Sequence, residues 1–415
     1  MSMPASLRAA LAEHRPGHAL PRAFAIDDDI YAHELETIWR ASWLYAGTTA
    51  QVPAPGDFFR FDLDDHSVIV VRGPDGELHA LHNTCRHRGM PVCPEQSGNV
   101  KRWVCPYHQW SYRLDGRLLG CGGMDEQLSP GEYGLRPAGV VKTGGLVFVW
   151  LGERPASPGA AAQELASALA PQGLDRAAVA HQLDYEVRAN WKLVWENNRE
   201  CWHCRTGHPE YVQANFDVAP DSERTRRLIS ARVEDHARVL AGSGIVDHAE
   251  PGLYRFPSAG RWWSANRTPL APGFVTESID GEPVAPPMGS YAGHDVGTLR
   301  VRTVPNFWCH ASADHAVLTR LTPAGPDLTR IRVQWLVDRD AIEGSDYELE
   351  RLLPFWQLTS EQDWSLCERN HAGVRNPAFI PGPYSPTREY NVIAFVEWYL
   401  GRVAGGPREA GPEAS

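Results

Sequence analysis

The sequence predicts an α+β protein in which a small all-β domain precedes a larger domain with an antiparallel sheet flanked by helices. Three observations support this fold class. The length of 415 residues suits two or three domains. Between about residues 44 and 151, short β-type runs alternate with turns that contain Gly and Pro. Beyond residue 156, strand-like runs are joined by longer helical patterns.

We divide the chain into four parts. Residues 1–43 are a helical segment that packs on the second domain, 44–155 are the β domain, 156–403 are the second domain, and 404–415 are a disordered tail rich in Gly, Pro and Glu. In the first part, Asp27-Asp28-Asp29 begins a helix, because acidic residues complement the dipole at a helix N-terminus.

Periodicity and turn residues predict the elements of both domains. The expected strands of the β domain span 58–61, 67–71, 78–81, 103–105 and 146–151. In the second domain, Asn190 is the expected N-cap of a helix over 191–203. Further helices are expected at 160–169, 340–369 and 391–403, strands at 183–187, 299–304, 316–321 and 329–337, and pocket-lining loops at 251–289.

Composition narrows the partners and the compartment. The formal charge of −11 argues against nucleic-acid binding. No apolar run approaches the ~20 residues that a membrane span requires, and charged residues near the start argue against a secretory signal. We therefore expect a cytoplasmic protein that acts on a small molecule. Its eight cysteines are expected to be reduced thiols or metal ligands rather than disulfides.

The first group of metal-ligating residues lies in the β domain. Cys85 and His87 are separated by one residue, and Cys105 and His108 are separated by two. A Rieske [2Fe–2S] centre needs two cysteines on one iron and two histidines on the other. A structural zinc site is the alternative, although such sites often take their histidines from a helix rather than from Gly-rich loops between strands.

The second group lies on the predicted helix 191–203 and just beyond it. Glu196, Glu200 and His203 follow i, i+4, i+7 spacing and therefore share one helix face. Gly207 and the Pro that follows His208 loosen or end the helix, so that His208 can join His203 on one metal. Two histidines and one carboxylate form the facial triad of non-haem Fe(II) oxygenases, which leaves positions open for dioxygen.

The third ligand of this site comes from elsewhere in the chain. The run 359–368 offers three carboxylates, and spacing alone does not choose among Glu361, Asp363 and Glu368. Cys201 and Cys204 present a competing zinc-binding pair on the same helix.

These motifs together resemble the α-subunits of Rieske non-haem iron oxygenases, over residues 30 to 403. The resemblance rests on both ligand groups and on the Cys-Pro-Tyr-His-Gln-Trp run at 105–110. The strings Glu-Asn-Asn-Arg-Glu-Cys at 196–201, Gln-Asp-Trp at 362–364 and Pro-Gly-Pro-Tyr-Ser at 381–385 are similar to the branch that acts on quaternary ammonium compounds. That branch includes the glycine betaine, stachydrine (proline betaine) and carnitine oxygenases.

The resemblance implies a role for each ligand. Cys85, His87, Cys105 and His108 would hold the [2Fe–2S] cluster, and His203, His208 and Asp363 would hold the mononuclear iron. Glu200 occupies the place of a bridging acid, which is Asp in most ring-hydroxylating members. It would carry electrons from His108 of one subunit to His203 of the next. Trp202 stands where relatives commonly have Tyr.

The resemblance also implies partners and a reaction. It implies a helix-grip-like catalytic domain and a homotrimer without a β-subunit. A separate flavin- or ferredoxin-type reductase would supply electrons from NAD(P)H. With O2, the enzyme would hydroxylate an N-methyl group of a betaine and release formaldehyde. The alternatives are an oxygenase that acts on an aromatic acid, by O-demethylation or ring hydroxylation, and a Rieske protein that only transfers electrons.

A quaternary ammonium has no N–H and is held by aromatic faces. The candidate pocket residues are therefore aromatic, and they are Trp202, Tyr254, Trp262, Trp263, Phe307 and Trp308. The carboxylate of a betaine also needs a cationic or hydrogen-bonding partner, and no single Arg or His stands out in the sequence.

Overall fold

The structure is a computed structural model that describes residues 3–124, 128, 130–219, 222–252 and 262–405. Its first part consists of three small antiparallel sheets with the strand orders β1-β10-β9, β4-β3-β2-β5 and β6-β7-β8. The strands are β1 (Leu44–Thr48), β2 (Asp57–Leu63), β3 (His66–Arg72), β4 (Leu78–His82), β5 (Ser97–Asn99), β6 (Trp103–Val104), β7 (Ser111–Tyr112), β8 (Leu118–Gly120), β9 (Gly139–Thr143) and β10 (Leu146–Trp150).

One large sheet organises the second part. Its seven strands have the order β11-β17-β16-β15-β14-β13-β12, and every neighbouring pair is antiparallel except β12 and β13. The strands are β11 (Ala177–Val187), β12 (Glu250–Pro251), β13 (Trp263–Thr268), β14 (Thr298–Thr303), β15 (Phe307–Ala311), β16 (Ala316–Pro323) and β17 (Thr329–Asp338). This arrangement confirms the predicted α+β class.

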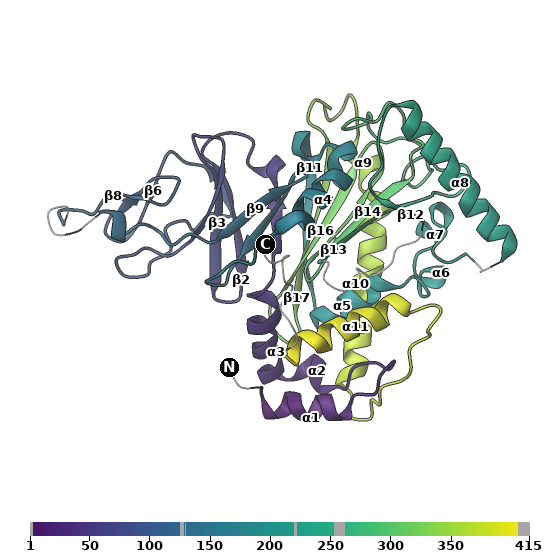
Figure 1. Cartoon of the computed structure of the whole chain (residues 1–415), viewed down its shortest axis with the longest axis horizontal. Coiled ribbons are helices and arrows are strands. Elements are labelled where there is room, and N and C mark those ends of the chain that lie inside the picture. The colour runs from purple at the N-terminus through teal and green to yellow at the C-terminus, as the bar shows by residue number, and fades with distance from the viewer. Residues whose placement is uncertain (1–2, 125–127, 129, 220–221, 253–261, 406–415) are drawn as a thin grey trace.

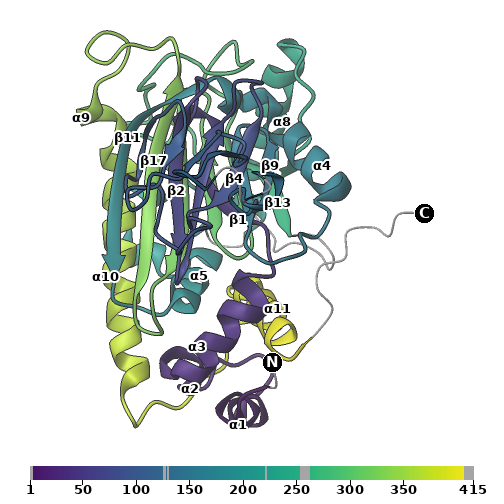
Figure 2. The same ribbon diagram turned by 90° about the vertical axis from the view of Figure 1, so that its left-hand side faces the viewer.

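Helices surround the large sheet. They are α1 (Ala5–Glu13), α2 (Ala23–Ile26), α3 (Asp28–Glu34), α4 (Gly159–Leu169), α5 (Trp191–Arg199), α6 (Cys204–Gly207), α7 (Tyr211–Ala214), α8 (Glu223–Gly242), α9 (Leu349–Leu352), α10 (Pro354–Arg375) and α11 (Tyr390–Val403). Both ribbon views place α1, α2 and α3 beside α11 (Figures 1 and 2). The β domain extends to one end of the molecule, and α8 lies at the other end (Figure 1).

The two faces of the large sheet bury different partners. On β15, Trp308 joins the hydrophobic cluster that contains Trp195 of α5 and Trp364 of α10. Phe307, its neighbour, points to the opposite face, where its ring lies 4.2 Å from that of Tyr45 on β1. Side chains alternate across a strand, so one face of the sheet meets α5 and α10, and the other meets the β domain together with α4.

The N-terminal segment is attached to the second domain by a buried charge cluster. Glu34 of α3 accepts hydrogen bonds from Lys192 Nζ at 2.6 Å, from Trp191 Nε1 at 2.8 Å and from the Tyr399 hydroxyl at 2.5 Å. Both charged side chains are 2% exposed or less. Removing one partner of a buried ion pair leaves the other charge buried and unpaired, which destabilises the fold. These contacts therefore hold α3 against α5 and α11.

The structure confirms many of the predicted elements. Asp27 caps α3 by accepting from the amide of Ile30 at 2.9 Å, and Asn190 caps α5 by accepting from the amide of Lys192 at 3.1 Å. All five predicted strands of the β domain are present.

Other elements differ from the prediction. The helix expected at 191–203 ends at Arg199, and 340–348 is not helical. Strand β13 lies in the stretch expected to be loops, and β15 was not predicted. Strand β15 escapes a period-2 pattern because both of its faces are buried, so hydrophobic and polar residues do not alternate.

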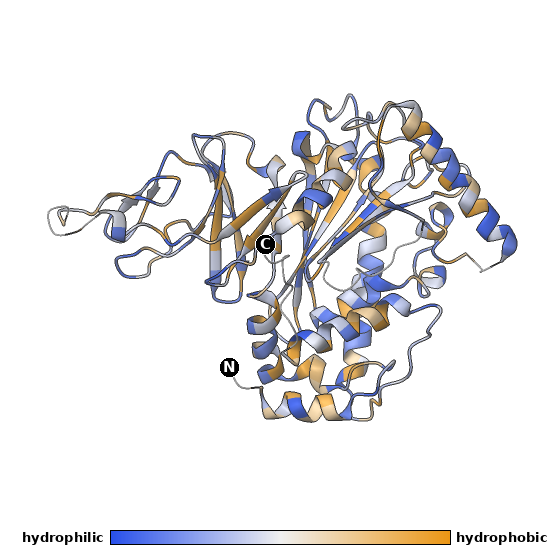
Figure 3. Ribbon diagram, viewed as in Figure 1, coloured by the Kyte–Doolittle hydropathy of each residue, from blue (hydrophilic) through white to orange (hydrophobic). Residues whose placement is uncertain are grey.

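Hydropathy follows this architecture. Orange, hydrophobic segments run along the strands, whereas α8 carries long hydrophilic stretches (Figure 3). Only His236 and Leu240 of α8 are buried. Among the described residues, no helix is both long and apolar enough to cross a membrane.

Candidate metal centres and the adjoining cavity

Two loops of the β domain share one backbone design, and each carries a cysteine and a histidine. In each loop the cysteine amide donates to a carbonyl at the far end, at 2.9 Å for Cys85 and 2.8 Å for Cys105. The cysteine carbonyl accepts from Gly89 in one loop and from Gln109 in the other, both at 3.0 Å. Both closing residues have positive φ, 79° and 62°. The repeated geometry presents the two ligand pairs to each other.

The four predicted cluster ligands meet at the tips of these loops. Nδ1 of His87 lies 3.1 Å from Nδ1 of His108. The thiols of Cys85 and Cys105 are buried, form no disulfide and lie within hydrogen-bonding reach of each other. The Tyr112 hydroxyl lies 3.2 Å from Cys85 Sγ. Two sulfur donors below and two half-exposed imidazoles above fit the donor set of a Rieske cluster.

The second site is built where α5 ends. Glu200 follows the last residue of α5 with an extended backbone, φ −137° and ψ 169°. Its carboxylate accepts from the amide of Trp202 and lies 2.5 Å from His203 Nδ1. The helix has ended at this point, so Glu200 and His203 meet through a turn rather than on the single helix face that the sequence predicted. Helix α6 then begins at Cys204 and ends before His208.

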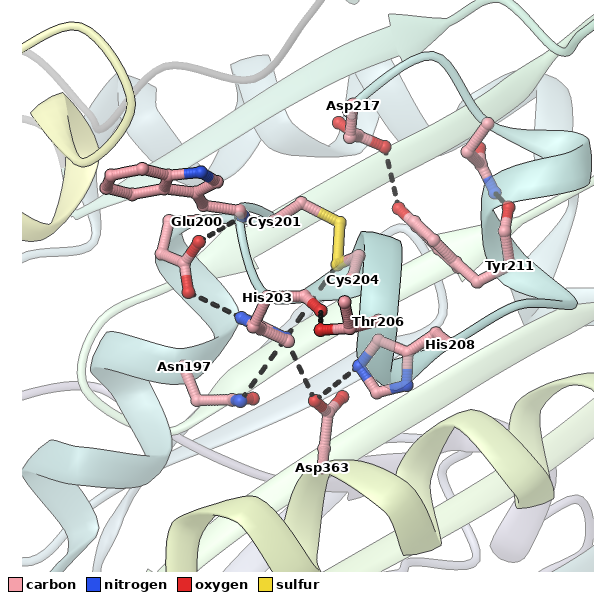
Figure 4. Close-up of a disulfide and its surroundings, with 12 residues drawn as sticks. Asn197, Glu200, Cys201, His203, Cys204, Thr206, His208, Tyr211, Asp217 and Asp363 are labelled. Carbon is pink, nitrogen blue, oxygen red and sulfur yellow. Dashed lines mark hydrogen bonds and ion pairs between the residues drawn. A yellow bond between two sulfur atoms is a disulfide. The ribbon is translucent and has the colours of Figure 1, made fainter. Parts of the chain in front are cut away.

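Three side chains converge beside this turn. Oδ1 of Asp363, from the middle of α10, lies 3.2 Å from His203 Nε2 and 2.8 Å from His208 Nε2 (Figure 4). The other two candidate carboxylates point elsewhere. Glu361 accepts from Gln357 at 2.9 Å, and Glu368 accepts from the amide of Arg188 at 3.0 Å.

The donor set fits a mononuclear iron. Nδ1 of His203 faces Glu200, and Nδ1 of His208 lies 2.7 Å from Oε1 of Gln362. Both acceptors keep the ring proton on Nδ1 and leave the Nε2 lone pairs for a metal, which is the usual arrangement of ligating histidines. Neutral imidazoles and a carboxylate are ligands that Fe(II) accepts.

The electrostatic field at this point favours a cation. Burial alone would lower the pKa of His203, but Asp363 and Glu200 outweigh burial and raise it to about 10. Burial alone would raise the pKa of Asp363, but the two histidines lower it. A nearby negative charge stabilises a proton or a metal ion equally well, so the three side chains suit a metal cation.

The cysteines beside this site correct one expectation. Cys201 and Cys204 form a disulfide across the turn that carries His203 (Figure 4). Their Cα atoms are 5.0 Å apart, a separation that permits the bond. The expectation that all eight cysteines are reduced is therefore wrong for this pair, and the bonded sulfurs do not form a zinc site.

Cavities reach the convergent residues from two sides. A cavity of about 500 Å³ is lined by His203, His208 and Asp363 and extends towards α8. A small recess of about 30 Å³ adjoins it at Asp363 and is lined by aromatic rings. A second cavity of about 350 Å³ meets His203 from the side of α11 and contains Glu196. Burial raises the pKa of Glu196 to about 7.

The structure divides the six aromatic pocket candidates. Trp308 lines the recess next to Asp363. Trp202 is 59% exposed, and Tyr254 lies outside the described residues. Trp262, Trp263 and Phe307 belong to the core cluster that contains Phe148 of the β domain. These three side chains fill the core on the face of the sheet opposite α5 and α10. We therefore no longer place them in the pocket.

The cavity also contains residues that the sequence did not single out. They are Trp356 and Trp364 of α10, Arg300 and Arg302 of β14, and His310 of β15. Trp356 meets His310 edge-on, with ring centroids 4.2 Å apart. The sequence pattern that could have identified the residues on the two strands is the spacing Arg-x-Arg and Trp-x-His. On adjacent strands this spacing puts four polar or aromatic side chains on one buried face.

Comparison with protein families identifies both parts of the chain. Residues 42–129 match the Rieske [2Fe-2S] domain, and residues 174–405 match the catalytic domain of the ring hydroxylating alpha subunit. The first match favours the Rieske cluster over the zinc alternative. The second match excludes a protein that only transfers electrons.

Curated relatives extend over nearly the whole chain. The glycine betaine monooxygenase oxygenase subunit of Chromohalobacter salexigens is 40% identical over 395 residues, which cover 94% of this chain and 86% of the relative. Its counterpart from Pseudomonas aeruginosa strain PAO1 is 38% identical over 387 residues, 93% of this chain and 89% of the relative. The carnitine monooxygenase oxygenase subunit of Acinetobacter pittii is 29% identical over 47% of this chain and 53% of the relative.

Solved structures share the fold. The quaternary ammonium Rieske monooxygenase CntA in complex with L-carnitine superposes with a TM-score of 0.70 at 17% identity, over 97% of this chain and 99% of that one. Naphthalene 1,2-dioxygenase from Rhodococcus sp. superposes with a TM-score of 0.69 at 20% identity, over 97% of this chain and 98% of that one.

Proposed function

Because this chain belongs to the Rieske non-haem iron oxygenase α-subunits, we propose that it N-demethylates a quaternary ammonium substrate of the betaine type. Members carry a [2Fe–2S] cluster and a mononuclear iron, and they use O2 with electrons from a separate reductase. The resemblance to two glycine betaine monooxygenase oxygenase subunits over more than nine-tenths of the chain supports this substrate class.

The cavity beside Asp363 is the observation that carries the proposal. Trp308, Trp356 and Trp364 line the recess that Asp363 also lines. Aromatic faces attract a desolvated cation by ≈2 kcal/mol or more, and they do so without a hydrogen bond. The recess itself, at about 30 Å³, is too small for a trimethylammonium group. The adjoining cavity of about 500 Å³, which Trp356 and Asp363 also line, has room for that group beside the side chains that we assign to the iron.

We assign His203, His208 and Asp363 to the mononuclear iron, and Cys85, His87, Cys105 and His108 to the cluster. When bound, the cluster supplies single electrons and the iron supplies the site of dioxygen activation. The protein orients both histidines of the iron site through Glu200 and Gln362. It also buries His208, which is 1% exposed, whereas the side chains of His203 and Asp363 are 21% and 20% exposed and face the cavity.

Electrons are proposed to reach the iron site from a neighbouring subunit. In one chain the loops near β6 and β8 and the turn at α6 lie far apart, towards opposite ends of the molecule (Figure 1). Exposed hydrophobic side chains surround both places, with Tyr107 52% and Met90 41% exposed beside the cluster loops and Trp202 exposed beside Glu200. These exposed side chains support a contact between subunits, and we propose a homotrimer without a β-subunit in which Glu200 bridges His108 of one subunit and His203 of the next.

The reaction balances as a monooxygenation. One oxygen atom of O2 enters an N-methyl C–H bond, and the other leaves as water with two electrons and two protons. The resulting N-hydroxymethyl ammonium loses formaldehyde and a proton and leaves the demethylated amine. Formaldehyde is thus the product that identifies the reaction.

The test is formaldehyde release with O2, NADH and a surrogate reductase. Glycine betaine, stachydrine, carnitine, choline and vanillate are the substrates. We expect formaldehyde from at least one quaternary ammonium compound. Formaldehyde from vanillate alone would replace the proposal with aromatic O-demethylation. The absence of formaldehyde from every ammonium compound, in protein that holds about three irons per chain, would also overturn the proposal.

A further inference from the structure

The inner face of β14 and β15 is unusually polar for a buried sheet. Arg300 is the register partner of His310, and Arg302 is the register partner of Trp308. All four side chains are 5% exposed or less. Buried charges in a sheet are rare unless they are paired or functional, and all four of these side chains line the cavities at Asp363.

Arg300 serves the structure of the cavity wall. Its guanidinium donates to both oxygens of Asp217, at 3.0 and 2.9 Å, and also to Asn215 at 2.7 Å and to the Tyr211 hydroxyl at 2.9 Å. This bidentate pair neutralises the charge of Arg300. Its role is therefore to join β14 to α7 and the loop that follows it.

His310 lines the cavity as a neutral ring. Burial lowers the pKa of His310 to about 4, so the ring is neutral. Burial alone would raise the pKa of Glu277, but His310 and Arg300 lower it, so Glu277 is ionised. Nδ1 of His310 lies 3.8 Å from Oε2 of Glu277. Neither ring nitrogen has a hydrogen-bond partner among the described residues, so the neutral ring offers one unpaired acceptor nitrogen.

The part of the cavity wall around His310 therefore attracts a positive group and repels a carboxylate. The neutral ring of His310 lines the cavity, the charge of Glu277 lies 3.8 Å from that ring, and Trp356 meets the ring in a T-shaped contact. Together with Trp308, these groups provide aromatic surface and negative potential. The part of the 500 Å³ cavity next to this recess, which His310, Trp356 and Asp363 line, is the place for an ammonium group.

The adjacent register pair, Arg302 and Trp308, adds a positive charge to the cavity wall. Arg302 lies two residues along β14 from Arg300, which corresponds to about 7 Å at ~3.3 Å per residue. Its Nε donates to the amide oxygen of Asn198 on α5 at 3.3 Å. This bond orients the guanidinium at the cavity wall, and guanidinium is the side-chain group best matched to a carboxylate.

We propose that the cavity binds a zwitterion, with Arg302 holding the substrate carboxylate while His310, Trp308 and Trp356 surround the quaternary ammonium group. The inference rests on the proposed function and adds the feature that separates betaines from choline. The spacing of the two register pairs suits a small substrate whose charges are a few bonds apart. Arg302 is thus the specificity-determining residue for the anionic end.

Three probes of equal shape test the proposal on the unaltered holoprotein without reductase, so that no turnover occurs. Glycine betaine carries both charges. Choline lacks the carboxylate, and 3,3-dimethylbutanoate replaces the ammonium nitrogen by carbon. We expect calorimetry to show glycine betaine binding at least about tenfold more tightly than either single-charge probe, since a charge-assisted hydrogen bond contributes about 1.5–3 kcal/mol. Equal affinity for choline, or no binding by any probe, would overturn the proposal.

A matched pair of variants assigns the effect to one residue. R302Q is expected to weaken glycine betaine binding by about 10- to 150-fold and to leave choline binding within about threefold, whereas Arg302→Lys retains part of the preference. R330Q is the control, because Arg330 lies on β17 of the same sheet but is exposed and paired with Glu186. The visible spectrum of the cluster reports folding.

The outcomes separate this inference from the proposed function. Equal losses of glycine betaine and choline binding in R302Q would remove the role of Arg302 but leave N-demethylation standing, because choline also carries N-methyl groups. Failure of every ammonium compound to release formaldehyde would remove N-demethylation itself.

Discussion

The two metal-binding regions are built in opposite ways. The proposed cluster ligands lie within residues 85–108, on two loops with the same backbone bonds and half-exposed imidazoles. The proposed iron ligands are Asp363 and two histidines, the nearer of which is 155 positions away in sequence, and His208 is buried. An electron must enter through a surface, whereas oxygen chemistry needs a shielded site. The difference fits our proposal that the local motif serves electron transfer and the long-range motif serves catalysis.

The largest expected effect separates the two regions completely. Replacing Asp363 with Ala removes the only carboxylate that contacts both histidines in the described structure, so we expect loss of the mononuclear iron and of activity. Iron content should fall from about three to about two per chain, while the visible spectrum of the cluster remains. Glu361→Ala is the control, and this variant should keep all three irons per chain. Loss of the cluster spectrum in the Asp363 variant would show that the regions are not independent.

The next effect concerns the link between the regions. Glu200→Gln keeps the bond to the amide of Trp202 but removes the charge beside His203 Nδ1. We expect turnover to fall about 10- to 100-fold, as for other groups that orient a metal ligand, with iron content unchanged. Single-turnover oxidation of the reduced cluster, followed by stopped flow, measures the step directly. A normal rate of cluster oxidation would remove Glu200 from the electron route.

The disulfide gives a smaller effect that sharpens the contrast. Replacing Cys201 and Cys204 together with Ser opens a short loop, which costs roughly 2 kcal/mol in the chain-entropy account. We expect the thermal midpoint of the second domain to fall by about 4–8 °C. Iron should remain bound, because the sulfurs are bonded to each other. If iron is lost while the protein stays folded, Cys204 belongs to the metal site.

The smallest effect belongs to the cluster region. Tyr112→Phe removes the hydroxyl that lies 3.2 Å from Cys85 Sγ. Hydrogen bonds to cluster sulfur raise the reduction potential, so we expect the potential to fall by about 20–60 mV, the one-electron equivalent of roughly 0.5–1.5 kcal/mol. Tyr133→Phe, in the same hydrophobic cluster, is the control. Protein-film voltammetry measures both, and an unchanged potential in the Tyr112 variant would exclude the bond.

Local motifs were predictable because their geometry depends on near neighbours. Cys85, His87, Cys105 and His108 could be chosen from spacing and turn residues alone. The predicted N-cap Asn190 was correct for the same reason, since a cap bonds an amide two or three residues on. The helix start predicted at Asp27-Asp28-Asp29 was also correct, and Asp27 is its N-cap. The α+β class followed from the change of pattern near residue 156.

Periodicity failed where side chains override it. The helix over 191–203 looked continuous, but it ends at Arg199, and the Glu200 carboxylate instead bonds the amide of Trp202 in the turn that follows. Strand β15 was missed because it is buried on both faces. The cavity residues Trp308 and His310 could therefore not be separated from Phe307, which points the other way.

The sequence by itself determined the two ligand motifs, the fold class and the family, because these depend on spacing along the chain. The tertiary structure decided which carboxylate meets the histidines, since Glu361, Asp363 and Glu368 differ only in the direction they take from α10. It also decided which aromatic and cationic side chains share one cavity. The physical reason is that strand register and helix packing join distant positions, and Arg302 and Trp308 become neighbours only when β14 pairs with β15.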